Sequence, residues 1–173
     1  SRLKRLIEDL LVLSDIENKR ESEELEFDVN EAIERTVEIL KPIAEEKEIC
    51  ILQELDKDIH LSGSVDRFRQ MMLNLTENAI KYSYKGQKIW VRALKKDGEI
   101  EVSVRDEGIG IAPEHHQRLF ERFYRVDKSR SKKVGGTGLG LSIVKHIAVL
   151  FGASLRVESQ VGATFYVTFH SRK

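Results

Sequence analysis

One helical stretch of this sequence carries polar side chains where an apolar stripe would be expected. In NLTENAIKYS (74–83), two amides, an ammonium and a phenol recur at helical spacing and share one face: Asn74, Asn78, Lys81 and Tyr82. An amide oxygen suits magnesium, which prefers oxygen ligands, a lysine can meet phosphate as a point charge, and a tyrosine can stack on a base. A merely polar helix surface is the competing interpretation, and it does not explain the shared face.

A glycine-rich loop, GGTGLGLSIVK (135–145), precedes an apolar helical run. Successive backbone N–H groups in front of a helix bind anions, and the helix dipole adds to the attraction. The loop does not match a P-loop, which needs Lys-Ser/Thr where Leu141 and Ser142 stand, or the dinucleotide fingerprint, which needs a strand before it. Taken alone, the loop is explained about as well by a glycine-rich linker.

A second loop, DEGIG (106–110), directly follows a predicted strand. Asp106 at the strand end can accept a hydrogen bond from an exocyclic amine, and Gly108 and Gly110 allow the chain to turn around a flat ring. Taken alone, an ordinary turn with an aspartate is the better explanation of this stretch.

The hydrophobic pattern predicts the elements that must position these side chains. Helices are predicted over 1–17, from Asp28 or Asn30 to beyond Leu40 with a bend at Pro42, from Asp66 to Ile80, over 114–120, and over 139–150 with Gly152 as the C-terminal cap. Strands are predicted over 49–55, 59–61, 88–94, 99–104, 154–158 and 163–169, with a hairpin turn at Asp97 and Gly98. Helices and strands are segregated, which indicates an α+β fold with one face of a sheet under helices.

The first helix, SRLKRLIEDLLVLSDIE, has a wide apolar stripe and no N-cap before it. We expect that it begins upstream of this sequence and that another helix packs on its stripe. The alternative is that it folds back onto its own domain. The polar residues 18–26 are interpreted as a linker.

Composition excludes several classes of protein. The 29 basic and 29 acidic residues cancel, so net charge gives no indication of a nucleic-acid or membrane-surface partner. The lone cysteine, Cys50, rules out a disulfide framework, and its apolar neighbours predict a small core residue. No apolar run approaches the roughly 18 to 20 residues that span a bilayer.

Four segments occur together in one order: NLTENAIKYS, DEGIG, FERFYR (120–125) and GGTGLGL. They resemble the N, G1, F and G2 boxes of the ATP-binding catalytic domain of bacterial sensor histidine kinases, in the GHKL superfamily. The resemblance covers roughly residues 25–170 and implies a two-layer α/β sandwich of the Bergerat type, with a mixed, mostly antiparallel sheet under helices. It divides the chain into the end of the second dimerisation and phosphotransfer helix (1–18), a linker (19–26) and the catalytic domain (27–171), with an ATP lid over about 111–137.

The resemblance also implies roles for individual residues. Asn78 holds Mg²⁺, Lys81 and Arg125 contact phosphates, and Asn74 takes the first N-box position; these four are the expected catalytic residues. Around the adenine, the resemblance implies Tyr82 over the ring, Asp106 on its amino group, and Gly108, Gly110 and Ile111 beside it. On the phosphates, it implies the backbone N–H groups of Gly136, Gly138 and Gly140, with Thr137, Leu139 and Leu141 alongside. Family members often carry a longer G-x-G-T turn before the last strand, whereas this chain has VGATF (161–165), so Thr164 is not assigned to the adenine.

The function implied is that of a two-component kinase. Its domain binds ATP with Mg²⁺ and transfers the γ-phosphoryl group to a histidine on the dimerisation domain, for relay to an aspartate of a response regulator. No histidine of this chain stands in a phosphoacceptor context: His60, His115, His116, His146 and His170. The domain is expected in the cytoplasm and the full-length protein as a homodimer, in many relatives anchored in the inner membrane, whereas this chain alone is expected to be a monomer.

Three other functions share the fold or the motifs. GHKL ATPases carry a water-activating glutamate at the first N-box position, where this chain has Asn74, and Glu77 should project about 100° away from Asn78 around the helix. A non-catalytic interaction module is a second alternative, and the intact N, G1 and G2 positions argue against it. A serine kinase of the anti-sigma type is a third, and the opening helix does not suit it.

Overall fold

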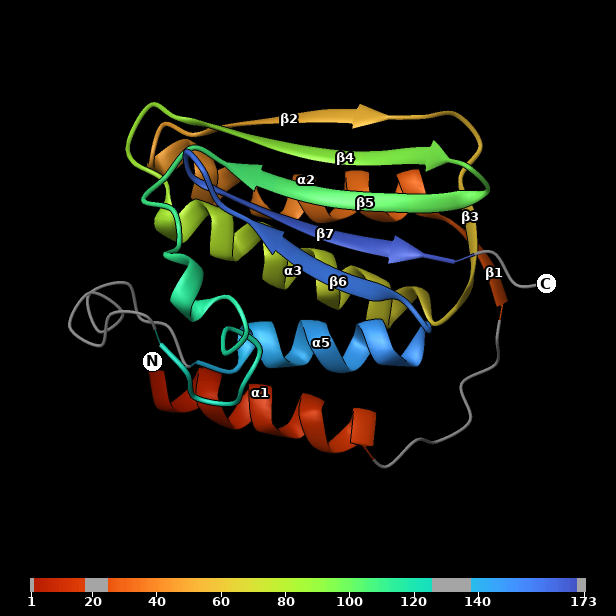
Figure 1. Ribbon diagram of the computed structural model, residues 1–173, viewed down its shortest axis with the longest axis horizontal. Helices are drawn as coiled ribbons and strands as arrows, with labels where there is room; N and C mark the ends of the chain where they lie inside the picture. Colours follow the sequence, from red (N-terminus) through yellow and green to blue (C-terminus); the bar gives the residue numbers. More distant parts are fainter. Residues whose placement is uncertain (1, 18–24, 126–137, 171–173) are drawn as a thin grey trace.

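The computed structural model describes residues 2–17, 25–125 and 138–170. The helices are α1 (Arg2–Glu17), α2 (Val29–Glu46), α3 (Val65–Tyr82), the single 3₁₀ turn η1 (Pro113–His115) and α5 (Gly140–Leu150). The strands are β1 (Leu25–Asp28), β2 (Cys50–Leu55), β3 (His60–Gly63), β4 (Lys88–Lys96), β5 (Glu99–Asp106), β6 (Ser154–Glu158) and β7 (Ala163–Phe169). Figure 1 shows α2, α3 and α5 covering one face of the main sheet, with α1 lying along α5.

The main sheet has five strands in the order β2-β4-β5-β7-β6. β2 runs parallel to β4, and the other neighbouring pairs are antiparallel, which confirms the expected mixed, mostly antiparallel sheet. The predicted hairpin turn joins β4 to β5, with positive φ at both Asp97 (49°) and Gly98 (79°). Because β5 pairs with β7, Asp106 at the end of β5 lies opposite Ala163.

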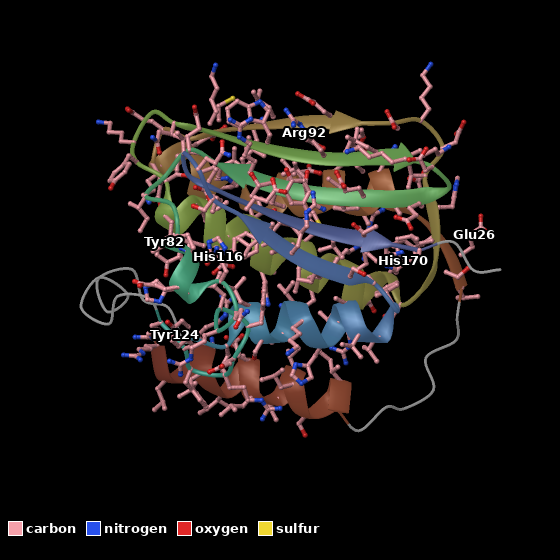
Figure 2. All side chains as sticks on the ribbon, viewed as in Figure 1. Glu26, Tyr82, Arg92, His116, Tyr124 and His170 are labelled. Carbon is pink, nitrogen blue, oxygen red and sulfur yellow. The ribbon has the colours of Figure 1, made fainter. Side chains whose placement is uncertain are left out.

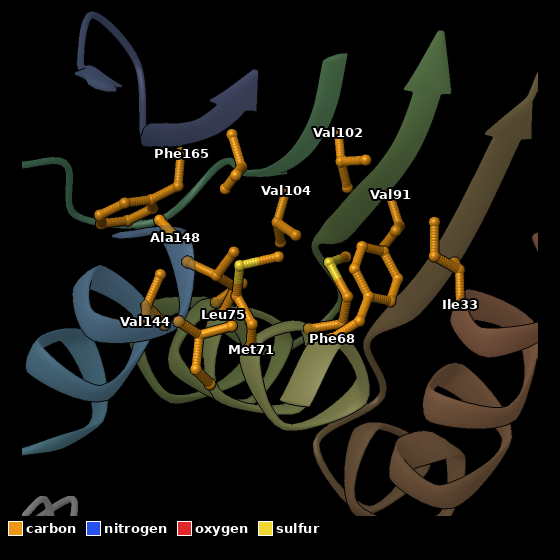
Figure 3. Packing of buried hydrophobic residues seen from close by; sticks show 14 of the residues in the cluster. Ile33, Phe68, Met71, Leu75, Val91, Val102, Val104, Val144, Ala148 and Phe165 are labelled. Carbon is orange, nitrogen blue, oxygen red and sulfur yellow. The ribbon is translucent and has the colours of Figure 1, made fainter. Parts of the chain in front are cut away.

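The core lies between this sheet and α3. Phe68, Met71 and Leu75 project from one face of α3 and are fully buried, and they face Val91 and Val104 of the sheet (Figure 3). Ser64 begins the helix as an N-cap by accepting a hydrogen bond from the Arg67 N–H. The apolar face thus fixes the rotation of α3, and the rotation decides where its polar face points.

Helix α2 begins as predicted, because the Asp28 carboxylate accepts a hydrogen bond from the Glu31 N–H (3.1 Å). Pro42 does not end the helix, which continues to Glu46. Lys47 follows as the C-cap residue.

Helix α1 divides its apolar stripe between two environments. Leu13 and Ile16 are buried against the rest of the domain, on the side that packs along α5. Leu3, Ile7 and Leu11 are 66%, 51% and 64% exposed. The helix therefore does fold back onto its domain along one side, and it keeps an uncovered apolar side as well.

Three local predictions were wrong. Residues 114–120 form only the end of the 3₁₀ turn and successive turns, and Leu119 and Phe120 pack against the core from there. The interpreted linker ends early, since β1 begins at Leu25 and pairs with β3. Cys50 is exposed, because β2 is an edge strand and Cys50 faces away from the helices.

Among the described residues, no helix combines the length and the apolar character that crossing a membrane requires.

Candidate functional site

A large pocket opens beside the polar face of α3. The space between its walls amounts to about 1190 Å³ when the open solvent at its mouth is included. Figure 2 shows the labelled residues Tyr82, His116 and Tyr124 on this side of the molecule and His170 on the other. The pocket is lined by Arg5, Asp9, Asn74, Glu77, Asn78, Lys81, Tyr82, Asp106, Ile109, Gly110, Ile111, Leu119, Tyr124, Arg125, Gly138, Gly140, Leu141, Ala163 and Phe165.

The four polar residues of the α3 face all line this pocket, as their spacing predicted. Asn74 uses its amide at both ends: Oδ1 accepts from Gln70 Nε2 (3.0 Å) and Nδ2 donates to the Gly140 carbonyl (3.2 Å). Asn74 thereby ties α3 to the start of α5. The Asn78 amide, in contrast, makes no hydrogen bond to any described residue, so its oxygen is available to a ligand.

Asp106 is 3% exposed and forms part of one wall of the pocket, here called the Asp106 wall together with Ile109, Gly110, Ala163 and Phe165. Its Oδ1 atom accepts hydrogen bonds from the N–H groups of Gly108 (2.9 Å) and Ala163 (3.3 Å). No described residue donates to Oδ2, which leaves that oxygen for a ligand donor. Burial raises the pKa of the Asp106 carboxyl above its usual value, although the two N–H groups act in the opposite direction.

Glycines are required around this wall for steric reasons. A Cβ atom on Gly108 would stand 1.9 Å from the Tyr82 carbonyl oxygen, so any other residue would push the loop off α3. Gly162 has φ +74°, and its Cβ would stand 2.0 Å from the Asp106 carbonyl oxygen. The short turn before β7 therefore packs directly on the DEGIG loop, and Ser159 Oγ joins them by accepting from the Ile111 N–H (2.8 Å).

A second part of the pocket lining carries most of its charge and is called the charged wall. It consists of Arg5, Asp9, Glu77, Asn78, Lys81 and Arg125. Arg5 of α1 binds both Glu77 oxygens through Nη1 (3.2 Å) and Nη2 (3.3 Å), and its Nε contacts Asp9 (3.3 Å). Lys81 Nζ lies 3.7 Å from Glu77. Contrary to expectation, Glu77 therefore lines the pocket, but two cations neutralise its carboxylate.

Arg125 completes the charged wall from the segment that follows the F box. Its Nη2 atom is buried and has no hydrogen-bond partner within the described part of the chain. Burial lowers the pKa of the guanidinium, and the nearby positive charge of Arg2 lowers it further. A partly exposed guanidinium with one buried, unpaired nitrogen beside another cation favours an anion at this point. Tyr124 next to it is held by a hydrogen bond to His115.

Most of the predicted site residues converge on the pocket. Eleven line it: Asn74, Asn78, Lys81, Tyr82, Asp106, Gly110, Ile111, Arg125, Gly138, Gly140 and Leu141. Gly108 shapes the loop from behind, and the Leu139 side chain is buried in the core instead of facing the pocket. Gly136 and Thr137, with the rest of the predicted lid from residue 126 onward, lie outside the described residues. Thr164 pairs with Arg105 in the sheet and does not line the pocket.

Sequence reasoning missed the pocket residues of α1, three residues of the Asp106 wall (Ile109, Ala163 and Phe165) and Tyr124. Arg5 and Asp9 carry no motif, and only the packing of α1 brings them to the pocket. Tyr124 could have been found, because it lies inside the quoted FERFYR segment.

The side chains of the pocket supply only part of the oxygen ligands that a hard cation such as Mg²⁺ requires. No group of three or more His, Cys, Asp or Glu residues that could hold a metal occurs in the described ranges. A single amide oxygen from Asn78 suits Mg²⁺, which keeps several waters and takes its other ligands from substrate phosphates.

The chain matches known proteins over most of its length. Residues 63–173 match the family described as "Histidine kinase-, DNA gyrase B-, and HSP90-like ATPase". The sensor-like histidine kinase SenX3 of Mycolicibacterium smegmatis is 38% identical over 95% of this chain and 44% of its own length. The sensor histidine kinase YkoH of Bacillus subtilis is 40% identical over 96% of this chain and 36% of its own.

Among solved structures, full-length ShkA in complex with AMPPNP superposes with a TM-score of 0.84 at 28% identity, over 96% of this chain and 35% of that one. The chain thus spans less than half of these relatives. With the α+β fold, the four boxes in order and the pocket that they line, these matches show that the chain belongs to the histidine kinase-, DNA gyrase B- and HSP90-like ATPase family, as an ATP-binding catalytic domain of the sensor histidine kinase type.

Proposed function

We propose that this chain binds ATP with Mg²⁺ and positions its γ-phosphoryl group for transfer to a histidine on a dimerisation domain. One observation carries the proposal: three polar groups without a described partner meet in one pocket, namely Asp106 Oδ2, the Asn78 amide and Arg125 Nη2. They are an acceptor for an adenine amino group, an oxygen ligand for magnesium and a cation for phosphate. Phosphoryl transfer asks a protein mainly for such positioning and charge neutralisation.

Each wall then has its own task. Asp106 accepts the adenine amino group through Oδ2, while Gly108 and Gly110 let the backbone pass close to the ring, and Tyr82 covers it. On the charged wall, Asn78 holds the metal, which neutralises phosphate charge when bound. Lys81 and Arg125 contact the phosphates from the protein side.

The glycine-rich start of α5 supports the phosphates from a third side. The backbone of Gly138 and Gly140 lines the pocket in front of the helix, where N–H groups attract anions. Asn74 keeps this helix start in register with α3 through its hydrogen bond to the Gly140 carbonyl. We therefore assign Asn74 a positioning task within the catalytic set.

We also propose a place for this domain in a longer protein, and the greater length of its sensor histidine kinase relatives supports it. The phosphate acceptor is a histidine on a dimerisation domain whose second helix ends in α1, and the product serves a response regulator. The full-length protein works as a homodimer with this domain in the cytoplasm. The exposed apolar side of α1 supports the bundle part of this proposal.

A GHKL-type ATPase is less well supported by the site. Asn74 stands where the water-activating glutamate would be, and its amide is fully engaged. Glu77 reaches the pocket, but both of its carboxylate oxygens already contact Arg5, so neither is left to orient a water molecule. Steady ATP turnover by the isolated chain would reverse this preference.

The test is calorimetric titration of a non-hydrolysable ATP analogue into the chain, with and without Mg²⁺. Mg²⁺ should strengthen binding, and Asn78→Ala should lose that gain while keeping its thermal transition. Asn78→Asp retains an oxygen ligand and should keep a magnesium response. Absence of binding under every condition would contradict the proposal, as would covalently retained phosphate on this chain alone after incubation with labelled ATP.

A further inference from the structure

The last turn of α3 is held by a residue that lies outside the pocket. A helix leaves its final carbonyl groups without internal partners. Here the Lys47 ammonium, from the end of α2, donates to the carbonyl oxygens of Ile80 (2.8 Å), Lys81 (3.0 Å) and Ser83 (2.8 Å). One partly buried cation therefore satisfies three carbonyls at the negative end of the helix dipole.

The remaining carbonyls of this turn are also paired. Ser83 Oγ donates to the Ala79 carbonyl (2.7 Å), and the Ile109 N–H of the DEGIG loop donates to the Tyr82 carbonyl (3.3 Å). The Tyr82 carbonyl is also the atom that a Cβ on Gly108 would strike. A shift of this turn would therefore move the loop that holds Asp106.

This arrangement separates the tasks of two lysines. A lysine in the last turn of a helix can bind the terminal carbonyls itself, and Lys81 stands in that turn. Its Nζ instead faces the pocket, 3.7 Å from Glu77 one turn earlier. Because Lys47 already occupies the carbonyls, Lys81 has no competing site at the helix end.

We propose that Lys47 is a positioning residue for nucleotide binding: it caps α3 from outside so that Lys81 and Tyr82 face the pocket and the DEGIG loop keeps its place. Lys47 touches neither the pocket nor any ligand in it. This inference rests on the proposed function, since the ligand that it helps to hold is the ATP of that proposal.

The test uses Lys47→Met, which keeps the apolar stem and removes the ammonium. Its matched control is Lys41→Met, the same change at an exposed lysine of the same helix. We expect affinity for the Mg²⁺–ATP analogue to fall by about 10-fold in Lys47→Met, because the carbonyl groups left without a partner would bind Lys81 in its place. Lys41→Met should bind like wild type, and Lys47→Arg should recover part of the loss.

A double-mutant cycle separates positioning from mere stabilisation. Lys81→Met should weaken binding strongly in the wild-type and Lys41→Met backgrounds. It should weaken binding much less in the Lys47→Met background, because in that variant Lys81 already points away from the phosphates. Equal losses from Lys81→Met in all backgrounds, or wild-type affinity in Lys47→Met, would overturn the inference. If Lys47→Met has no cooperative thermal transition, Lys47→Gln replaces it: its two N–H donors cannot serve all three carbonyls, so a smaller loss of affinity is expected, and equal losses from Lys81→Met in all backgrounds would still overturn the inference. Failure of the wild-type chain to bind would instead reject the proposed function.

Discussion

The Asp106 wall of the pocket is held by backbone hydrogen bonds and glycine contacts, whereas the charged wall is held by ion pairs between side chains of α1 and α3. On the first wall, the N–H groups of Gly108 and Ala163 fix one carboxylate oxygen. On the second, Arg5 and Lys81 surround Glu77, and Arg125 has a buried nitrogen without a described partner. The backbone contacts of the first wall need no ligand and leave one Asp106 oxygen for a donor, whereas the second wall contains positive charge that an anion would neutralise.

Because the two walls are held differently, substitutions on them should differ in their effects on the free energy of unfolding and on ligand affinity. Changes on the Asp106 wall alter backbone packing and thus folding as well as binding. Changes at Lys81 and Arg125 of the charged wall should alter binding and its salt dependence with little loss of stability, because both side chains are partly exposed and neither makes a short ion pair with a described residue.

The largest effect is expected from Gly108→Ala. The new Cβ would meet the Tyr82 carbonyl at 1.9 Å, and neither the loop nor the helix end can yield without breaking the hydrogen bonds between them. We expect a loss of about 1 to 3 kcal/mol in the free energy of unfolding, as for other overpacked sites. Urea denaturation measures it, and analogue binding should be lost in parallel.

Gly140→Ala is the matched control at the start of α5. A Cβ there has open space, and alanine favours a helix over glycine. This variant should be at least as stable as wild type. Equal destabilisation by the two substitutions would show that the contact with the Tyr82 carbonyl is not what requires a glycine at position 108.

The next effect in size is expected from Asp106→Asn. The amide oxygen can still accept from Gly108 and Ala163, but an NH₂ group replaces the free acceptor and would oppose the adenine amino group. Affinity for the ATP analogue should fall by about 10- to 100-fold, which corresponds to the 1 to 3 kcal/mol cost of an unpaired buried polar group. Titration calorimetry measures this loss.

The same variant tests the pKa of Asp106. Burial raises the folded-state pKa above 3.8, so the folded wild type binds a proton more tightly than the unfolded chain does. The stability that protonated Asp106 contributes is therefore present at low pH and is lost as pH rises through the folded pKa. Asp106→Asn should lack this decline and should be no less stable than wild type near neutral pH. A wild type that gains stability relative to Asp106→Asn as pH rises would contradict the sign.

The same contrast explains what the sequence could predict. The Asp106 wall and the α3 face depend on local features: helical spacing, a strand end and glycines at fixed offsets. These singled out Asn78, Lys81 and Asp106, the resemblance to sensor histidine kinases joined them in one expected site, and the pocket contains all three. The fold class and most strands followed from the hydrophobic pattern.

Features that depend on long-range packing were missed. Arg5 reaches Glu77, 72 positions along the chain, only because α1 packs along α5. Leu139 was expected beside the phosphates because it stands between two glycines, but it begins α5 with its side chain in the core. Cys50 has apolar neighbours in sequence, and only the strand order reveals that its strand lies at an edge.

The smallest effect on folding is expected from Arg125→Met, which tests the charged wall. Removing this guanidinium deletes a buried unpaired donor and its repulsion with Arg2, so the midpoint of urea unfolding should not fall. Affinity for the ATP analogue should fall by about 10-fold, as expected for a charge-assisted phosphate contact, and ADP should lose less if the contact is to the terminal phosphate. Because salt screens charge interactions, wild-type affinity should decline with ionic strength and the variant's decline should be shallower.

Arg122→Met, an exposed change three residues earlier and outside the pocket lining, should leave affinity and salt dependence as in wild type. An Arg125→Met chain that unfolds more easily and binds the analogue as tightly as wild type would mean that Arg125 belongs to the folded scaffold, and the distinction between the two walls would fail.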